Sequence, residues 1–179
     1  MQNDRPSSTL RRFFTGLTEN TFLIQLGVAD PPLVDYLSDM LMRFVRLDAV
    51  FKVRNLTGRP LTEIGQMLVE AKDRIGDARR EVHRHIGDYT LFRAGLYPES
   101  LRKTRGALDF DQFTDYCAHG KRAYLVASSI EVDEETEAPG DLLQRLSHQF
   151  EMCAYGLREV RRQWELREGD DDVRPFLIN

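Results

Sequence analysis

The histidines are the residues whose spacing first suggests chemistry in this chain. Three of the four have a polar residue one helical turn before them: Glu81 with His85, Asp115 with His119, and Gln144 with His148. Such spacing places both members of a pair on one side of a helix, and acidic residues with histidines on facing helices build metal sites in bundles. The Glu-x-x-His motif of dimetal bundles does not occur here, however. Ion pairs on a solvated surface are therefore the favoured interpretation, with a metal site as the alternative.

His85 differs from the other histidines because it lies on the apolar side of its predicted helix, beside Val82, Tyr89 and Phe92. Imidazole titrates near neutral pH, so a histidine in such a place can serve as a metal ligand or a general base. A core histidine whose hydrogen bonds are satisfied is the favoured interpretation. The chemical role is kept as the alternative.

Asp48 is a candidate buried carboxylate. On a helix that begins near Leu33 and turns by about 100° per residue, Asp48 falls between Phe44 and Phe51 inside the apolar sector. An ion pair with Lys52, one turn further on, is the favoured explanation. A functional carboxylate is the alternative.

The common catalytic motifs are absent from the sequence. It contains no Gly-rich phosphate loop, no G-x-S-x-G, no CxxC and no H-E-x-x-H, so an enzyme here would need a site built from scattered helix residues. No cofactor can be named on this basis. Cys117 and Cys153 lie among apolar residues of helical segments, and they are expected to be reduced core residues.

The net charge of the protein indicates which classes of partner it would not attract. The net charge is -4 and the isoelectric point is near 5.6, so the whole-protein field does not attract nucleic acid or an anionic membrane. Stretches rich in arginine are interleaved with acidic residues, as in solvated helix faces. No apolar run has the length of a membrane span or a signal peptide. We therefore expect a soluble cytoplasmic protein of the bacterial kind, without a nucleic-acid or membrane partner.

The hydrophobic periodicity predicts an all-α fold, a single-domain bundle of five to six helices over residues 1–179, with residues 1–8 and 169–179 as loose ends. Asp30 followed by two prolines marks one helix start, and Tyr97-Pro98 marks one helix end. The apolar run 21–28 is predicted to be helical because nothing else in the chain offers it a strand partner. The main helices are expected at 7–17, 33–51, 61–76, 77–96, 110–127 and 139–164.

Two of these helices have informative patterns. The helix at 77–96 has apolar residues on opposite faces, which is typical of a central, largely buried helix. The last helix has an apolar seam close to a heptad repeat: Leu142, Leu146, Phe150, Cys153, Leu157, Val160 and Trp164. Part of this seam should overhang the helix at 110–127, its most obvious internal partner. Val160 and Trp164 would then be available to a second copy of the chain, with the N-terminal helices as the alternative cover.

Residues 85–101 read HIGDYTLFRAGLYPESL, and this stretch resembles uncharacterised bacterial all-helical proteins that share a G-D-x-x-L-F-x-x-G-x-x-P-E-x-L segment. Asp115-Tyr116, Gly120 and Ala123-Tyr124 match a further segment of that group. The resemblance implies a helical fold and brings no established activity with it. It draws attention to Gly87, because a glycine within a helix suggests a close helix crossing or a ligand at that point.

Two hypotheses of function follow. The first is a protein that acts by association, with another protein or as a homodimer, through the seam of the last helix. The alternative is an enzyme or a binder of a small ligand or metal, with a pocket between the helices at 77–96 and 110–127. The residues expected to line that pocket are His85, Asp88, Tyr116, His119 and Tyr124. Asp88 could equally lock the two helices together by hydrogen bonds to tyrosine hydroxyls or to the backbone.

Overall fold

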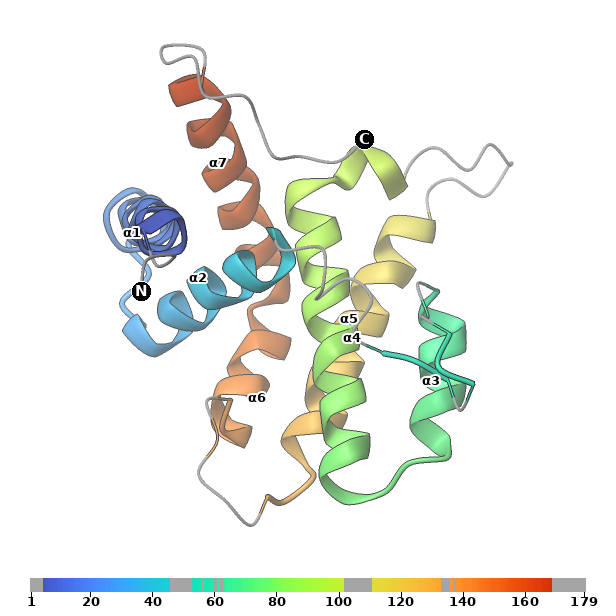
Figure 1. Cartoon of the computed structure of the whole chain (residues 1–179). Coiled ribbons are helices and arrows are strands. Elements are labelled where there is room, and N and C mark those ends of the chain that lie inside the picture. Colours follow the sequence, from blue (N-terminus) through green and yellow to red (C-terminus); the bar gives the residue numbers. More distant parts are fainter. Residues whose placement is uncertain are drawn as a thin grey trace.

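The computed structural model describes residues 5–45, 53–55, 57–59, 61, 63–101, 111–132, 136 and 138–168. Within this part of the chain the fold contains seven α-helices and no β-strand, which confirms the all-α prediction (Figure 1). The helices are α1 (Arg5–Glu19), α2 (Pro31–Val45), α3 (Ile64–Lys72), α4 (Gly76–Leu96), α5 (Asp111–Ser128), α6 (Gly140–His148) and α7 (Phe150–Glu168). A π-helical segment, η1 (Asn20–Gln25), follows α1, and a 3-10 turn, η3 (Pro98–Leu101), follows α4. The assignment of residues 1–179 to one domain stays a prediction.

The local signals at the helix ends act as predicted. The side chain of Asp30 accepts a hydrogen bond from the backbone N–H of Leu33 at 3.2 Å, so it caps the first turn of α2. At the end of α4, the backbone N–H of Tyr97 still bonds to the carbonyl of Arg93, and Pro98 follows outside the helix. The expected extension of α2 to residue 51, including Asp48, lies outside the described residues.

Helix α4 is the central element, as its two apolar faces predicted. Fifteen of its 21 residues are buried, and it packs on α3, α5, α7 and α2. Figure 1 shows α4 in the middle of the molecule, with α5 behind it and α3 to one side. A side chain on almost any face of α4 is therefore shielded from water.

Glycines allow the closest helix contacts. A Cβ added to Gly87 of α4 would lie 2.6 Å from the ring of Tyr124 on α5, and one added to Gly95 would lie 2.6 Å from Cβ of Leu157 on α7. Gly120 of α5 faces Thr90 and Phe150 in the same way. Of the two expectations for Gly87, a close helix crossing or a ligand, the structure shows a close crossing of α4 and α5.

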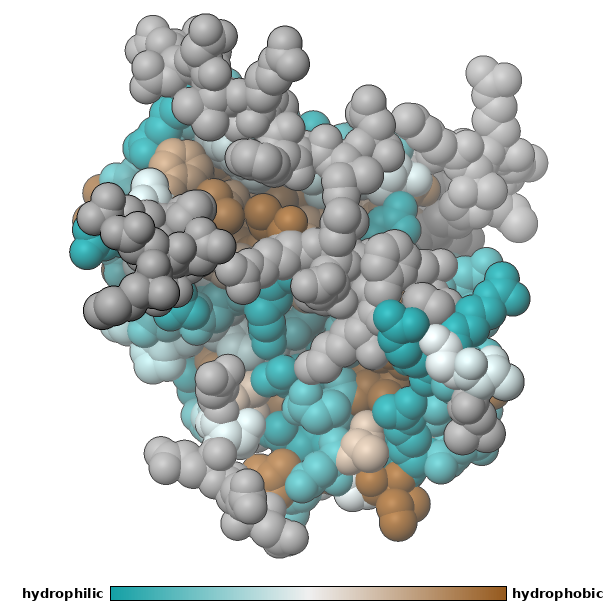
Figure 2. Space-filling model, viewed as in Figure 1, coloured by the Kyte–Doolittle hydropathy of each residue, from teal (hydrophilic) through white to brown (hydrophobic). Residues whose placement is uncertain are grey.

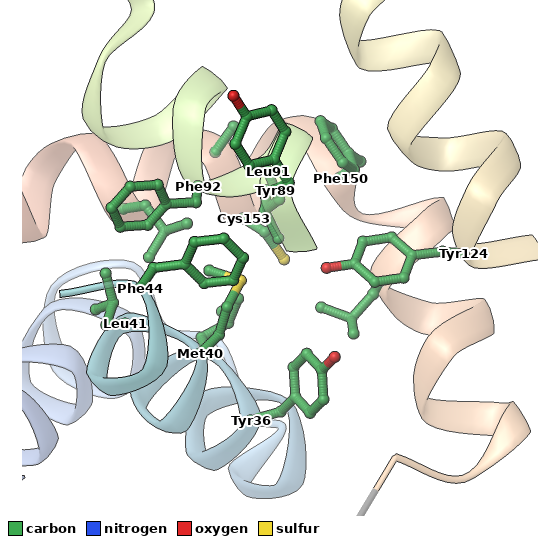
Figure 3. Close-up of a cluster of buried hydrophobic side chains, with 14 of the residues drawn as sticks. Tyr36, Met40, Leu41, Phe44, Tyr89, Leu91, Phe92, Tyr124, Phe150 and Cys153 are labelled. Carbon is green, nitrogen blue, oxygen red and sulfur yellow. The ribbon is translucent and has the colours of Figure 1, made fainter. Parts of the chain in front are cut away.

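The last predicted helix is two helices, α6 and α7, because the backbone turns at Gln149. This break raises the helix count above the five to six expected. All seven seam residues, from Leu142 to Trp164, are buried within the chain, and the ring of Trp164 meets Phe14 of α1 edge to face at 5.0 Å. The expectation that Val160 and Trp164 would be available to a second copy is therefore wrong, because α1, the alternative cover, packs on α7 at this end. Cys153 and Phe150 of the seam lie in the same core, with residues of α2 and α4 (Figure 3).

None of the described helices is long and apolar enough to cross a membrane. Cys117 and Cys153 are both free and buried, as expected.

Candidate functional site

The side chain of Asp88, in the middle of α4, joins three helices. Its Oδ1 accepts hydrogen bonds from the hydroxyls of Tyr36 on α2 at 2.6 Å and Tyr124 on α5 at 2.8 Å. Its Oδ2 accepts one from Arg43 of α2 at 3.1 Å. We call these four residues the polar centre. Figure 3 shows the hydroxyls of Tyr36 and Tyr124 directed toward the same region of the core.

The electrostatics of the polar centre follow from its burial. Asp88 is 3% exposed, and Tyr36 and Tyr124 are also buried. Burial, followed by the charge of Asp88, raises the pKa of both tyrosines well above 10, so both hydroxyls stay protonated and act as donors. Burial opposes the charge of Arg43, but Asp88 and Tyr36 outweigh it, and the pKa of Arg43 is raised. Asp88 is thus surrounded by donors, an environment suited to holding a carboxylate in place.

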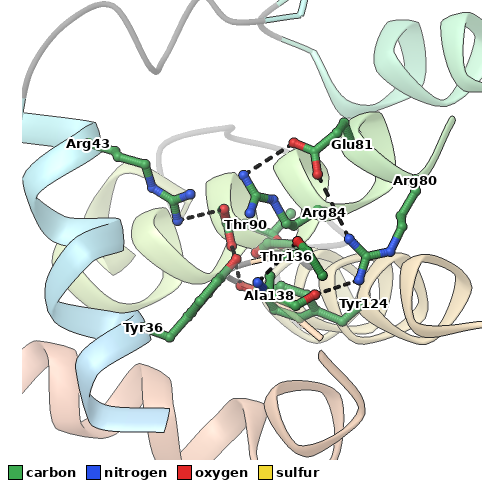
Figure 4. A network of polar contacts seen from close by, with 11 residues as sticks. Tyr36, Arg43, Arg80, Glu81, Arg84, Thr90, Tyr124, Thr136 and Ala138 are labelled. Atoms are coloured by element: carbon green, nitrogen blue, oxygen red, sulfur yellow. Dashed lines mark hydrogen bonds and ion pairs between the residues drawn. The ribbon is translucent and has the colours of Figure 1, made fainter. Parts of the chain in front are cut away.

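Two buried arginines continue the polar centre along α4. Arg80 and Arg84 precede Asp88 at four-residue steps, so the three side chains share one face of the helix. Arg84 pairs with Glu81 at 3.2 Å, and Arg80, which is 1% exposed, donates to the carbonyl of Ala138. In Figure 4, Arg84 lies between Arg80 on one side of the network and Arg43 with Tyr36 on the other. Arg80 thereby fixes the backbone just before α6.

A cavity of about 400 Å³ opens between α2 and the start of α6. Its lining combines charged, apolar and aromatic residues: Pro32, Asp35, Tyr36, Asp39, Pro139, Asp141, Leu142 and Arg145. Three of them are aspartates and one is an arginine, so the lining has an excess of negative charge. Arg145 is already paired, at 2.8 Å with Asp30 and at 2.8 Å with Asp141. Tyr36 belongs both to the cavity and to the polar centre.

The five residues predicted to line a pocket have different surroundings in the structure, and the pocket itself stays a prediction. Asp88 and Tyr124 are joined by a hydrogen bond, but the ring of Tyr124 lies against Gly87, where the pocket was expected. His85 is buried and stacks on Phe44 of α2 at 5.7 Å. Tyr116 is half-buried, burial raises its pKa, and His119 is exposed. The interpretation of Asp88 as a lock between helices is confirmed for its bond to Tyr124.

Sequence reasoning missed Tyr36 and Arg43. Tyr36 follows Leu33 by three residues and precedes Met40 by four, so it belongs to the apolar stripe of α2, and a tyrosine on such a stripe needs a partner for its hydroxyl. Arg43 follows Tyr36 by seven residues, which is two helical turns, and therefore lies on the same side. This spacing was a usable signal for a polar contact.

No three His, Cys, Asp or Glu side chains of the described segments are grouped so that they could hold a metal ion. Comparison of the chain with protein-family models, with curated proteins and with solved structures finds no match. The resemblance through residues 85–101 stays an expectation. A function for this site has to rest on its own residues and geometry.

Proposed function

We propose that the protein binds a small organic cation in the cavity between α2 and α6. The observation that carries this proposal is a cavity of about 400 Å³ with three aspartates and one arginine in its lining. Cavities of roughly 300–1,000 Å³ suit small ligands. The choice of a cation follows from the charge, because the one arginine is already paired with Asp30 and Asp141.

The cavity lining offers carboxylates for the charged group of such a ligand and apolar side chains for its carbon skeleton. Asp35 and Asp39 lie one helical turn apart on α2, and both are exposed. Asp39 already pairs with Arg11 at 3.0 Å, so Asp35 is the carboxylate better placed to pair with an ammonium group. Leu142, the prolines and the ring of Tyr36 give apolar contact for its carbon skeleton. Aromatic faces also attract cations. The guanidinium of Arg43, 5.3 Å from the centre of the Tyr36 ring, already makes one contact of this kind.

Ligand binding is favoured over the association expected from the sequence. The seam that motivated a homodimer or a protein partner is buried within the chain. The large apolar residues that remain exposed among the described ones lie on several different elements: Ile24, Val69, Ile75, Leu125, Tyr155 and Leu166. On the face shown in Figure 2, hydrophobic residues likewise occur in separate groups among hydrophilic ones. These observations support no single docking surface.

Three probes of similar size test the proposal. Benzylamine is a cation, benzyl alcohol is neutral and benzoate is an anion at neutral pH, and their affinities can be compared by ligand-observed NMR. We expect benzylamine to bind most tightly and benzoate least. Equal binding of all three, or the reverse order, would contradict a cation site.

Matched charge variants locate the interaction. Asp35→Asn with Asp39→Asn removes two carboxylates from the cavity, whereas Asp77→Asn with Asp115→Asn removes two exposed carboxylates from α4 and α5. The first pair should weaken benzylamine binding about fivefold, as expected for partly exposed ion pairs. The second pair changes the net charge equally and should leave the affinity unchanged. An equal loss in both would show a general effect of charge.

A further inference from the structure

Two tyrosines make equivalent hydrogen bonds to the same oxygen of Asp88 but occupy different surroundings. Tyr36 and Tyr124 donate to Oδ1 at 2.6 and 2.8 Å. The ring of Tyr124 is 0% exposed and lies against Gly87, so packing alone confines it. Tyr36, in contrast, lines the cavity between α2 and α6. Only one of the two bonds therefore ends in a residue that a cavity ligand would touch.

The bond to Asp88 can fix the wall of this cavity. A tyrosine side chain has two main torsions. Anchoring its hydroxyl to a buried carboxylate restricts the first, which swings the whole ring, whereas the hydroxyl lies on the axis of the second. Asp88 is itself held by Arg43 and Tyr124, so the anchor is attached to three helices. Tyr36 is 6% exposed and lines the cavity, whereas Tyr124 is 0% exposed.

We propose that Asp88 is a positioning residue for the cavity, which acts through the Tyr36 hydroxyl to hold the ring that forms part of the cavity wall. This inference rests on the proposed function, because it assigns a role in ligand binding. A purely structural role of Asp88 would make the two tyrosine bonds interchangeable. If Asp88 positions Tyr36, loss of the Tyr36 bond should weaken ligand binding more than loss of the Tyr124 bond.

Tyr36→Phe and Tyr124→Phe form the matched pair that tests this difference. Each removes one hydroxyl donor from Oδ1 and keeps an aromatic ring in place. Benzylamine affinity should fall about three- to tenfold in Tyr36→Phe, since the ligand must then order a freed side chain. The fall should be smaller in Tyr124→Phe, because packing confines that ring and because Tyr36 and Arg43 still bond to Asp88. Equal effects in the two variants, or a larger effect of Tyr124→Phe, would overturn the proposal.

A second readout needs no ligand. With ring-¹³C-labelled phenylalanine, NMR relaxation reports how freely the new ring moves in each variant. Residue 36 should show large-amplitude ring motion in Tyr36→Phe, while residue 124 should stay restricted in Tyr124→Phe. If residue 36 is as restricted as residue 124, the hydroxyl bond does not position the ring, and the inference fails. If the native protein binds none of the three probes, the proposed function fails, and this measurement alone decides whether Asp88 holds the ring.

Discussion

At the scale of single residues, Asp88 shows how a carboxylate is kept deep inside a helical bundle. Removing a charge from water costs several kcal/mol unless hydrogen bonds and an opposite charge replace the lost hydration. Asp88 receives three donors, and one of them belongs to the guanidinium of Arg43. Because the pKa of Tyr36 and Tyr124 is raised by burial and by Asp88, these donors lose no proton near neutral pH.

The raised pKa values of Tyr36 and Tyr124 predict that the folded protein loses stability as the pH rises above 10. Below pH 10, the ordinary tyrosine pKa, both hydroxyls are protonated in the folded and unfolded states, and their contribution is complete. Above pH 10 the unfolded chain ionises first, so each tyrosine should reduce the free energy of unfolding by about 1.4 kcal/mol per pH unit until its folded pKa is reached.

Urea unfolding at several pH values between 9 and about 11.5 checks this sign. The double variant Tyr36→Phe with Tyr124→Phe is the control, since it lacks both groups. Its stability should fall less steeply with pH than that of the native protein. Parallel slopes would contradict the assignment of these raised pKa values.

Gly87 gives a second prediction at this scale. Gly87→Ala would place a methyl group 2.6 Å from the buried ring of Tyr124, so the ring or α5 must move, and we expect a loss of roughly 1–3 kcal/mol. Gly16→Ala on α1 is the matched control, because nothing lies within 4 Å of the added Cβ. The control should raise stability, by up to about 1 kcal/mol. Urea unfolding measures both, and a neutral or stabilising Gly87→Ala would show that α4 and α5 are not in close contact there.

At the scale of elements, the division between α6 and α7 leaves the apolar seam continuous. Trp164 near the end of α7 is 6% exposed and packs on Phe14. Trp164→Ala should therefore lower the free energy of unfolding by about 3–5 kcal/mol. Leu166→Ala, a neighbour on α7 that is 64% exposed, should change it by less than about 0.5 kcal/mol.

Sedimentation of the same two variants bears on the homodimer, which stays a prediction. If Trp164 serves the core of one chain, Trp164→Ala changes stability and leaves the oligomeric state unchanged. A shift from dimer to monomer without loss of stability would show that Trp164 contacts a second copy.

The helices were largely predictable from local sequence, whereas the site was not. Asp30 and Tyr97-Pro98 mark helix ends through contacts within a few residues, and both signals held. The break at Gln149 could not be predicted from the sequence, because the helical spacing of apolar residues continues through it. The bond from Tyr36 to Asp88 joins residues 52 positions apart, and helical periodicity carries no information about contacts between helices. For the same reason the sequence predicts His119, Tyr116 and Tyr124 together beside Asp88, whereas among these three residues of α5 it is Tyr124 that bonds to it.

At the scale of the molecule, charged side chains lie in two regions: the buried face of α4 and the lining of the cavity. The buried face of α4 carries Arg80, Arg84 and Asp88, and Arg43 of α2 reaches the same carboxylate. The cavity outside this region has three aspartates in its lining. Tyr36 connects the two regions, because it lines the cavity and its hydroxyl donates a hydrogen bond to Asp88. A cation in the cavity would thus be attracted by the outer carboxylates and would contact a wall fixed from the centre of the bundle.

The place where benzylamine binds can be mapped directly by NMR chemical-shift perturbation on the native protein. A cation site between α2 and α6 should give the largest shifts at Asp35, Tyr36 and Leu142 around the cavity, and added salt should reduce these shifts because exposed charges are screened. Perturbations centred on the exposed apolar residues Val69 and Ile75, or insensitive to salt, would contradict a cation site between α2 and α6.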